Sequence, residues 1–140
     1  MNIKPYKNII ARVLVVDDNL SLGNLVAHAL GRIGHSCALE SSVAGARKRL
    51  AAEPFDLILL ENDLPDGKGV DLLSDAARGQ SALIVLMSGS PSARLQERAL
   101  ELGAFEFMEK PLSMERVAAL ASTAARPVAA ESSARKEVCP

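Results

Sequence analysis

The sequence predicts an α/β protein in which five strand–helix pairs form a doubly wound (βα)5 fold with a five-stranded parallel sheet. Short apolar runs alternate along the chain with amphipathic segments. The runs are apolar at almost every position, which is typical of strands in a parallel sheet covered by helices on both faces. The length of 140 residues suits a single domain with one core.

Five apolar runs are the predicted strands. Hydrophobic residues make up 49% of the chain and aromatic residues only 3%, so a core of Leu, Val, Ile and Ala is expected. Four runs are strong and one, at residues 36–39, is weaker. The strong runs lie at residues 12–16 (RVLVV), 56–60 (DLILL), 82–87 (ALIVLM) and 104–108 (AFEFM).

The first two helices are predicted from residue spacing and from end signals. The first begins after Asn19, a suitable N-cap, and ends at Gly34. The second covers residues 43–52 and stops before Pro54. The apolar face of the first helix has the i, i+3, i+4 spacing and consists of Leu22, Leu25, Val26, Ala29, Leu30 and Ile33.

Three further helices follow the later strands. One is expected over residues 70–78, closed by Gly79. The next is expected to start at Ser90, with Pro91 at its first helical position. The last opens at Ser113.

The two ends of the chain differ in composition from the middle. We expect the domain to occupy residues 11–125, after an N-terminal extension (1–10) and before a flexible tail or linker (126–140) that gains Pro, Ser and charge. The N-terminal apolar run is too short for a membrane span, and no signal-peptide cleavage site follows it. Cys37 and Cys139 lack metal-ligand spacing, which suits a reducing compartment. A cytoplasmic protein without a membrane partner is therefore expected.

The charge balance excludes a class of partners. The 16 Lys and Arg residues nearly balance the 17 Asp and Glu residues, giving a net charge of −1. Such a chain has no general attraction to nucleic acid, so no direct nucleic-acid contact is expected. His28 and His35 have no acidic or Cys neighbours at metal-ligand spacing, and neither is assigned a catalytic role.

Polar residues stand where four of the predicted strands end. Ligands of open α/β sheets bind at the carboxyl ends of the strands, so these residues are expected to converge. Carboxylates and a carbonyl suit Mg²⁺, while an ammonium and a hydroxyl suit a phosphoryl group, so this edge predicts phosphoryl chemistry on a carboxylate. The residues at these ends are Asp17, Asp18, Glu61, Asp63, Ser88 and Lys110.

Four sequence pieces occur in a fixed order across residues 11 to 125: VLVVDD, DLILLENDLPDGKG, an apolar strand ending in MSG, and the pair KP. In this order and spacing they resemble the receiver domains of bacterial two-component response regulators. The resemblance implies a flavodoxin-like fold, a phosphorelay signalling role rather than enzymatic turnover, and Mg²⁺ as cofactor. It also implies a sensor histidine kinase or phosphotransfer protein as partner, an output protein or domain, and a homodimer as one form of assembly.

The resemblance assigns roles to single residues. It implies that Asp18 binds Mg²⁺ directly, that Asp17 acts on the metal largely through water, and that Asp63 offers its backbone carbonyl. Ser88 and Lys110 match the hydroxyl and the lysine that reach for the phosphoryl group.

Ser88 also belongs to an expected switch. Together with Phe107 it matches the hydroxyl and the aromatic ring whose coupled movement reports activation in the family. Phenylalanine lacks the hydroxyl that a tyrosine would offer there. Two local alternatives remain: Ser88 can satisfy a neighbouring backbone group, and Phe107 can simply belong to the core.

The residue at the phosphoacceptor position departs from the family pattern. The phosphorylated aspartate of the family lies four residues before the loop proline, and counting back from Pro65 gives Glu61. Glutamate is longer by one methylene, about 1.5 Å. In a preorganised site a misplacement of about 1 Å costs roughly a hundredfold in rate. Glu61 is therefore expected to make the domain independent of phosphorylation, or to imitate the phosphorylated state by drawing Ser88 and Lys110 inward.

Several alternatives stay open. The chain can be a constitutive docking or scaffold domain that has lost the switch. It can be a receiver that is still phosphorylated, at Glu61 or at Asp63, or an ordinary receiver that carries an engineered substitution. A metal-dependent hydrolase of the phosphatase kind is a further class, but it needs an aspartate nucleophile where the chain has Glu61.

Overall fold

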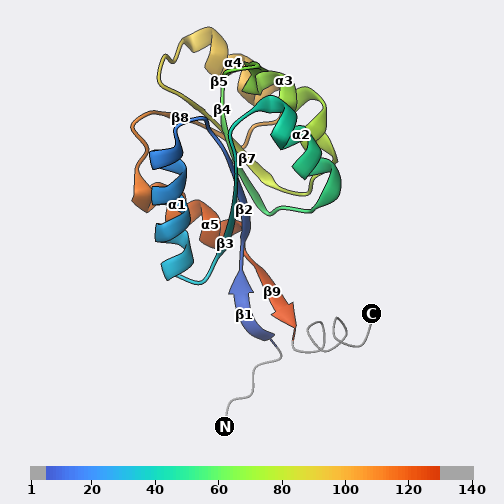
Figure 1. Ribbon diagram of the computed structural model, residues 1–140, viewed down its shortest axis with the longest axis vertical. Helices are drawn as coiled ribbons and strands as arrows, with labels where there is room; N and C mark the ends of the chain where they lie inside the picture. Colours follow the sequence, from blue (N-terminus) through green and yellow to red (C-terminus); the bar gives the residue numbers. More distant parts are fainter. Residues whose placement is uncertain (1–5, 130–140) are drawn as a thin grey trace.

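The parallel sheet predicted from the apolar runs is present in the computed structural model, which describes residues 6–129 (Figure 1). Its five strands are all parallel and run in the spatial order β3-β2-β4-β7-β8. This order confirms the doubly wound α/β fold. The strands are β2 (Arg12–Val16), β3 (Ser36–Glu40), β4 (Leu57–Glu61), β7 (Leu83–Ser88) and β8 (Glu106–Glu109).

Five α-helices cover the two faces of this sheet (Figure 1). Buried residues of α1 and α5 pack in the core of one face, and those of α2, α3 and α4 pack in the core of the other. A two-sided core of this kind explains why the strands are apolar at successive positions. The helices are α1 (Leu20–Arg32), α2 (Val43–Ala52), α3 (Gly69–Ser74), α4 (Ala93–Glu101) and α5 (Met114–Ala124).

The central strand β4 shows how one strand serves both cores. Every residue of β4 is buried. Ile58 and Leu60 join the core beside α2 and α3, while Leu57 and Leu59 join the core beside α1 and α5. Successive side chains of a strand point to opposite faces, so a strand covered on both sides needs apolar residues throughout.

Helix starts were predicted well where a capping side chain precedes the apolar face. The Asn19 side chain accepts a hydrogen bond from Leu22 N at 3.1 Å, and Ser113 Oγ accepts one from Arg116 N at 3.1 Å. The expected start of the fourth helix at Ser90 and Pro91 is wrong. The N-cap is Ser92, whose Oγ accepts from Leu95 N at 3.1 Å, so the helix begins two residues after Pro91.

The expected third helix is interrupted. It begins at Gly69 and ends at Ser74, and a separate 3₁₀ helix, η1 (Ala76–Gly79), follows. The backbone of Asp75 leaves the helical region, with φ −133° and ψ −76°. Ala77 is fully buried in the core beside α2 and α3, so the break lets the chain turn to pack this residue.

Helix α1 buries a narrower face than its spacing predicted. The residues that it buries are Gly23, Val26 and Leu30. Leu25 and Ile33, which we expected on the apolar face, are 52% and 53% exposed. The reason is geometric, since a helix on the outside of a sheet contacts it along one stripe only.

A ribbon of two antiparallel strands, β1 (Tyr6–Ile10) and β9 (Arg126–Ala129), extends from the end of the sheet opposite the carboxyl ends of its strands (Figure 1). We expected a flexible tail from residue 126, but its first four residues form this strand. Arg126 anchors it, because its guanidinium lies 2.9 Å from Asp56 Oδ1 and donates to Ser81 O at 2.8 Å. The remainder of the expected extension and tail, with Cys139, lies outside the described residues. Within residues 6–129, no helix is both long enough and apolar enough to span a membrane.

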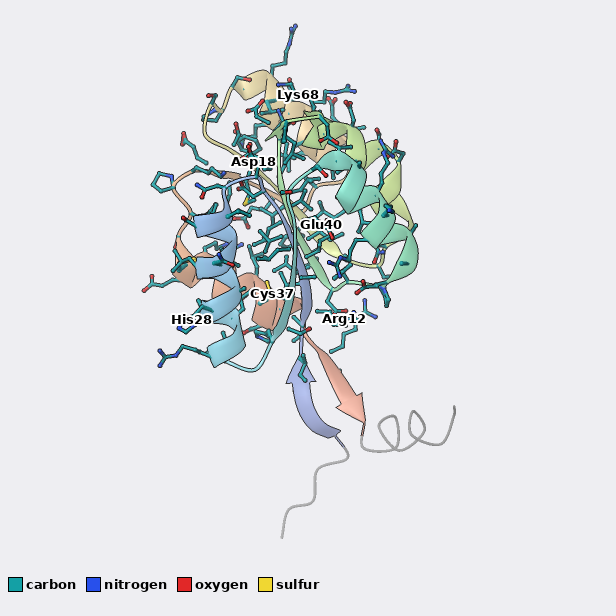
Figure 2. The ribbon with its side chains drawn as sticks, in the orientation of Figure 1. Arg12, Asp18, His28, Cys37, Glu40 and Lys68 are labelled. Carbon is teal, nitrogen blue, oxygen red and sulfur yellow. The ribbon has the colours of Figure 1, made fainter. Side chains whose placement is uncertain are left out.

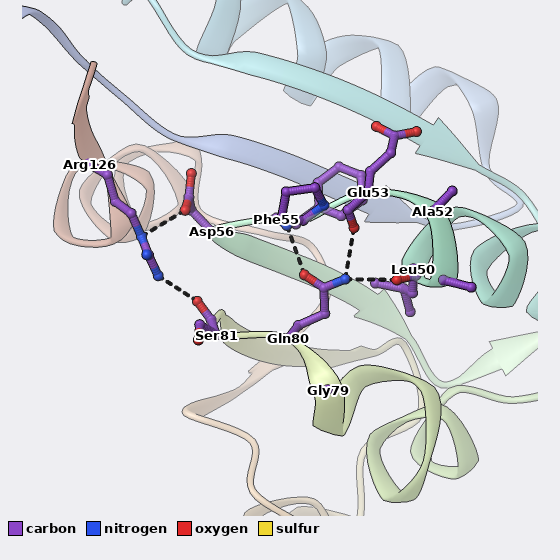
Figure 3. Close-up of a pocket in the computed structure, with 11 residues that line it drawn as sticks. Leu50, Ala52, Glu53, Phe55, Asp56, Gly79, Gln80, Ser81 and Arg126 are labelled. Atoms are coloured by element: carbon purple, nitrogen blue, oxygen red, sulfur yellow. Dashed lines mark hydrogen bonds and ion pairs between the residues drawn. The ribbon is translucent and has the colours of Figure 1, made fainter. Parts of the chain in front are cut away.

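Gln80 fastens the connection between α2 and β4, beside a pocket that Arg126 also lines (Figure 3). Its side-chain Oε1 accepts a hydrogen bond from Phe55 N at 2.8 Å. Its Nε2 donates to Leu50 O at 2.9 Å and to Glu53 O at 2.8 Å. One side chain thus satisfies three backbone groups that no regular element pairs.

Replacing Gln80 with alanine is expected to lower the free energy of unfolding by about 2 kcal/mol, because partly buried backbone groups lose their partners. Urea unfolding monitored by circular dichroism measures this. Gln96→Ala on the exposed side of α4 is the matched control, and we expect it to change stability by less than about 0.5 kcal/mol. Equal effects of the two variants would show that Gln80 does not fasten the connection.

Candidate functional site

Three of the residues predicted to converge are in direct contact. Lys110, which follows β8, places Nζ 2.6 Å from Asp17 Oδ2 and 2.5 Å from Glu61 Oε1. Asp17 follows β2, and Glu61 is the last residue of β4. These two strands are neighbours in the sheet, so their carboxyl ends bring the two carboxylates together. Lys110 reaches them from the far side of β7.

Both carboxylates are buried, with side chains that are 1% (Asp17) and 6% (Glu61) exposed. Asp17 Oδ1 accepts a hydrogen bond from Asn19 N at 2.9 Å, and Glu61 Oε2 accepts one from Asp63 N at 2.8 Å. Each of the four carboxylate oxygens therefore has a donor, either Lys110 or a backbone N–H.

Lys110 carries the positive charge of this cluster. Burial lowers the pKa of Lys110, but hydrogen bonds and charge interactions with Asp17 and Glu61 outweigh burial and leave the pKa above its ordinary value. The ammonium is therefore charged at neutral pH. It neutralises one of the two buried negative charges, which a low-dielectric site requires.

The expected switch residues lie on the two strands next to β4 on this side of the sheet, Ser88 at the end of β7 and Phe107 in β8. Ser88 is fully buried, and its Oγ accepts a hydrogen bond from Ser90 N at 3.0 Å. Its backbone carbonyl accepts from Lys110 N at 2.9 Å. Phe107 is half-buried, packs against the core beside α2 and α3, and lines a groove at the start of α4.

Asp18 and Asp63 lie at the same edge of the sheet but are exposed. Asp63 Oδ1 forms an ion pair with Lys68 Nζ at 2.6 Å. Figure 2 shows Asp18 and Lys68 at the end of the molecule where the strands of the sheet terminate. The acidic residues are therefore divided into a buried pair held by Lys110 and two that face solvent.

The residues expected to bind Mg²⁺ were chosen as oxygen donors, which this ion prefers. The chemical type of the donors suits Mg²⁺, since Asp17, Asp18 and the carbonyl of Asp63 all offer oxygen. As arranged they do not fit, because Lys110 and Asn19 N already occupy the oxygens of Asp17. Within residues 6–129 no three Asp, Glu, His or Cys side chains are grouped so that they could hold a metal ion.

Two residues of the site region were not recognised from the sequence. Asn62 Oδ1 accepts a hydrogen bond from Val70 N at 3.1 Å, which fixes the start of α3. Asp66 accepts two hydrogen bonds from the backbone at the start of α2, 22 and 23 residues away in sequence. The sequence offered no local signal for either contact, because the partners are distant along the chain.

The two histidines and Cys37, to which we assigned no catalytic role, lie away from the site. His35 is buried, and its Nδ1 accepts a hydrogen bond from Ala11 N at 2.9 Å. Burial lowers the pKa of His35, which favours the neutral ring that this acceptor role needs. Cys37 packs against the core beside α1, and burial raises the pKa of its thiol to about 11. His28 is exposed on α1.

A parallel five-stranded sheet with acidic residues at the carboxyl ends of two neighbouring strands and a lysine after the edge strand is the arrangement expected of a receiver domain. The chain belongs to the response regulator receiver domain family, whose model matches residues 13–122. Domains of this family are the receiving modules of two-component systems.

Characterised relatives agree. The chain is 35% identical over 116 residues to the response regulator protein PilR of Pseudomonas aeruginosa, covering 82% of this chain and 26% of PilR. It is 32% identical to the swarming motility regulation protein RssB of Serratia marcescens, covering 73% of this chain and 47% of RssB. The chain therefore spans between a quarter and a half of the length of these relatives.

Solved structures agree on the fold. A response regulator of Burkholderia pseudomallei, solved with a phosphorylated aspartic acid and a calcium ion, has a TM-score of 0.75 at 25% identity and covers 91% of this chain and 73% of that one. The beryllofluoride-activated NtrC4 receiver domain dimer has a TM-score of 0.74 at 30% identity and covers 81% of this chain and 94% of that one.

Proposed function

We propose that this receiver domain signals without an acyl phosphate at residue 61, where Glu61 stands in place of the acceptor aspartate. The observation that supports this most strongly is the contact between Glu61 Oε1 and Lys110 Nζ at 2.5 Å, with Oε2 held by Asp63 N. A phosphoryl group must be attacked by a carboxylate oxygen. Here both oxygens are engaged, and the side chain is only 6% exposed.

The length of glutamate supports the same proposal. Its carboxylate stands about 1.5 Å farther from the backbone than that of an aspartate. In a site built to align a donor, a shift of about 1 Å costs roughly a hundredfold in rate. The longer side chain also brings the carboxylate to Lys110 while Asp63 N holds it from the other side. Because the Glu61 carboxylate is held on both sides, we expect the site to stay in one state and not to alternate between a phosphorylated and an unphosphorylated form.

The expected Mg²⁺ ligands, Asp18, Asp17 and the Asp63 carbonyl, offer oxygen donors, but their present arrangement does not form a metal site. Binding of a divalent cation at Asp17 requires Lys110 to release Asp17 Oδ2. We therefore derive no step through the metal. Signalling without phosphorylation of Glu61, as proposed here, needs no bound metal ion.

The proposed partners are those of the family. They are a sensor histidine kinase or phosphotransfer protein and an output protein or domain, in a cytoplasmic pathway. Two relatives are named DNA-binding transcriptional regulators, and the NtrC4 receiver domain is a dimer. For this chain we propose signalling through protein contacts, with a homodimer over the face of α4, β8 and α5 as one form. Direct nucleic-acid binding by these 140 residues is not part of the proposal.

A second candidate function is constitutive docking, in which the fold is kept and the switch is lost. The hydrogen bond from Ser90 N to Ser88 Oγ favours it, because the hydroxyl is satisfied locally. The two candidates differ in what they predict for Ser88→Ala. A switch changes its partner affinity with this substitution, whereas a docking surface on α4, β8 and α5 keeps the same affinity.

The proposal is tested by incubating the protein with Mg²⁺ and a small acyl-phosphate donor and measuring its intact mass. We expect the natural protein to keep its mass. Glu61→Asp shortens the side chain, frees it from Lys110, and is expected to gain one phosphoryl group. Glu61→Gln, which keeps the length without a nucleophilic carboxylate, serves as the negative control.

A phosphoryl group on the natural protein would overturn the proposal. Mapping the modified residue would then decide between Glu61 and Asp63, which is exposed. If neither the natural protein nor Glu61→Asp is modified, the site has lost more than its acceptor, and the docking function is favoured.

A further inference from the structure

A short hairpin stands directly after Glu61 and before α3. It consists of β5 (Asp63–Leu64) and β6 (Gly67–Lys68), which pair in antiparallel fashion, and is named here the 63–68 hairpin. The ion pair between Lys68 Nζ and Asp63 Oδ1, at 2.6 Å, joins its two strands. Leu64 is buried in the core beside α2 and α3. The hairpin is therefore held by its own strand pairing and by the buried Leu64 side chain.

The 63–68 hairpin is bonded to the carboxylate of Glu61 at one end. The backbone N–H of Asp63 donates to Glu61 Oε2 at 2.8 Å. The residue between them, Asn62, is tied to the sheet by a hydrogen bond from its N–H to Met87 O at 2.9 Å. A change in the charge or position of the Glu61 carboxylate therefore acts directly on the Asp63 N–H, as it does on Lys110.

The same hairpin is bonded to α2 through Asp66. Asp66 Oδ1 accepts a hydrogen bond from Val43 N at 2.7 Å, and Oδ2 accepts one from Ala44 N at 3.0 Å. The first N–H groups of a helix have no partner within the helix, so these are the donors that a carboxylate satisfies best. The hydrogen bonds from Val43 and Ala44 lower the pKa of Asp66, which keeps the carboxylate ionised at neutral pH.

Close packing reinforces this bond. Gly67 has no side chain, and a Cβ there would lie 3.2 Å from Val43 Cγ2, closer than most Cβ contacts. Val43 in turn packs against the core beside α2 and α3. The hairpin and the start of α2 therefore touch through a hydrogen-bonded carboxylate and through an apolar contact, and one cannot shift far without the other.

We propose that Asp66 is a positioning residue that couples the Glu61 site to the N-terminal end of α2 through the 63–68 hairpin. A rearrangement of the Glu61 carboxylate then reaches α2 as well as the strands beside the site. Coupling between two places is reciprocal, so a change at Asp66 must also reach the Asp63 N–H and Glu61. This coupling does not depend on whether residue 61 accepts a phosphoryl group.

The test is a double-mutant cycle read by NMR on the full chain. Backbone amide shifts of Val43, Ala44 and Asp63 are compared in the natural protein, Glu61→Gln, Asp66→Ala and the double variant. We expect Glu61→Gln to shift the Val43 and Ala44 amides, and this response to be lost when Asp66 is alanine. In the other direction, Asp66→Ala is expected to shift the Asp63 amide and to speed its hydrogen exchange about tenfold.

Two further variants separate coupling from a general loss of stability. Asp71→Ala removes an exposed carboxylate from α3 and is expected to leave the Val43, Ala44 and Asp63 amides unchanged. Asp66→Asn keeps one acceptor oxygen and is expected to retain part of the response. The proposal is overturned if Glu61→Gln moves the Asp63 amide but not those of α2, or if its effect on α2 is the same with and without Asp66. Asp66 would then only cap the helix.

Discussion

Replacing Lys110 with methionine is expected to lower the free energy of unfolding by about 3 kcal/mol, because two buried carboxylates lose their shared cation. Asp17 and Glu61 both contact Lys110 Nζ and are almost inaccessible to solvent. Methionine has a similar length and no charge, so the substitution removes the ion pairs with little change in packing. Urea unfolding at pH 7 measures the loss.

A double variant identifies the cause. Lys110→Met combined with Glu61→Gln is expected to recover part of the stability, because only one buried carboxylate then remains. If Lys110→Met is as stable as the natural protein at pH 7, the cluster of Asp17, Glu61 and Lys110 does not stabilise the fold.

Replacing Gly69 with alanine is expected to cost about 3 kcal/mol, at the upper end of what overpacking costs. A Cβ at this position would lie 2.2 Å from Glu61 O and 2.9 Å from Glu61 C. Both are backbone atoms of the strand that carries the site residue, so no side chain can move aside. The hydrogen bond from Gly69 N to Asn62 O, 2.8 Å long, would also be disturbed.

Gly31→Ala is the matched control, because this glycine lies inside α1 and a Cβ there meets nothing within 4 Å. Alanine favours a helix over glycine, so this variant is expected to gain about 0.5 kcal/mol. Thermal and urea unfolding of the two variants are compared. A Gly69→Ala protein as stable as Gly31→Ala would mean that the chain after Glu61 adapts without strain.

Local patterns predicted most of the regular structure. The apolar runs located the five strands of the sheet to within two residues at each end, and helix α2 was predicted with the observed ends. Asn19 and Ser113 were recognised as caps because a cap and the N–H that it accepts from lie three residues apart. Signals of this kind act within one turn of helix or within one strand, so they can be recognised in a single sequence.

Errors arose where a distant partner decides the local structure. Residues 126–129 lack the periodicity of a helix, yet they form β9 because β1, at the other end of the chain, supplies the hydrogen bonds. The helix predicted at 70–78 breaks at Asp75, where the chain turns to bury Ala77 in the core. Leu25 has the right spacing for a core residue, but it lies beside the stripe of α1 that contacts the sheet and is 52% exposed.

The order and spacing of the motifs were enough to predict the family, the fold and the edge of the sheet at which the polar residues meet. Parallel strands must end on one side, so the order of the motifs is enough to place Asp17, Glu61 and Lys110 there. Their pairing, in contrast, follows from the folded arrangement of the strands. Lys110 and Asp17 are 93 residues apart, and their contact depends on which strands are neighbours and on which oxygens backbone N–H groups have already taken. The same holds for Asp66, whose bond to α2 exists only because the folded chain brings the 63–68 hairpin to the start of that helix.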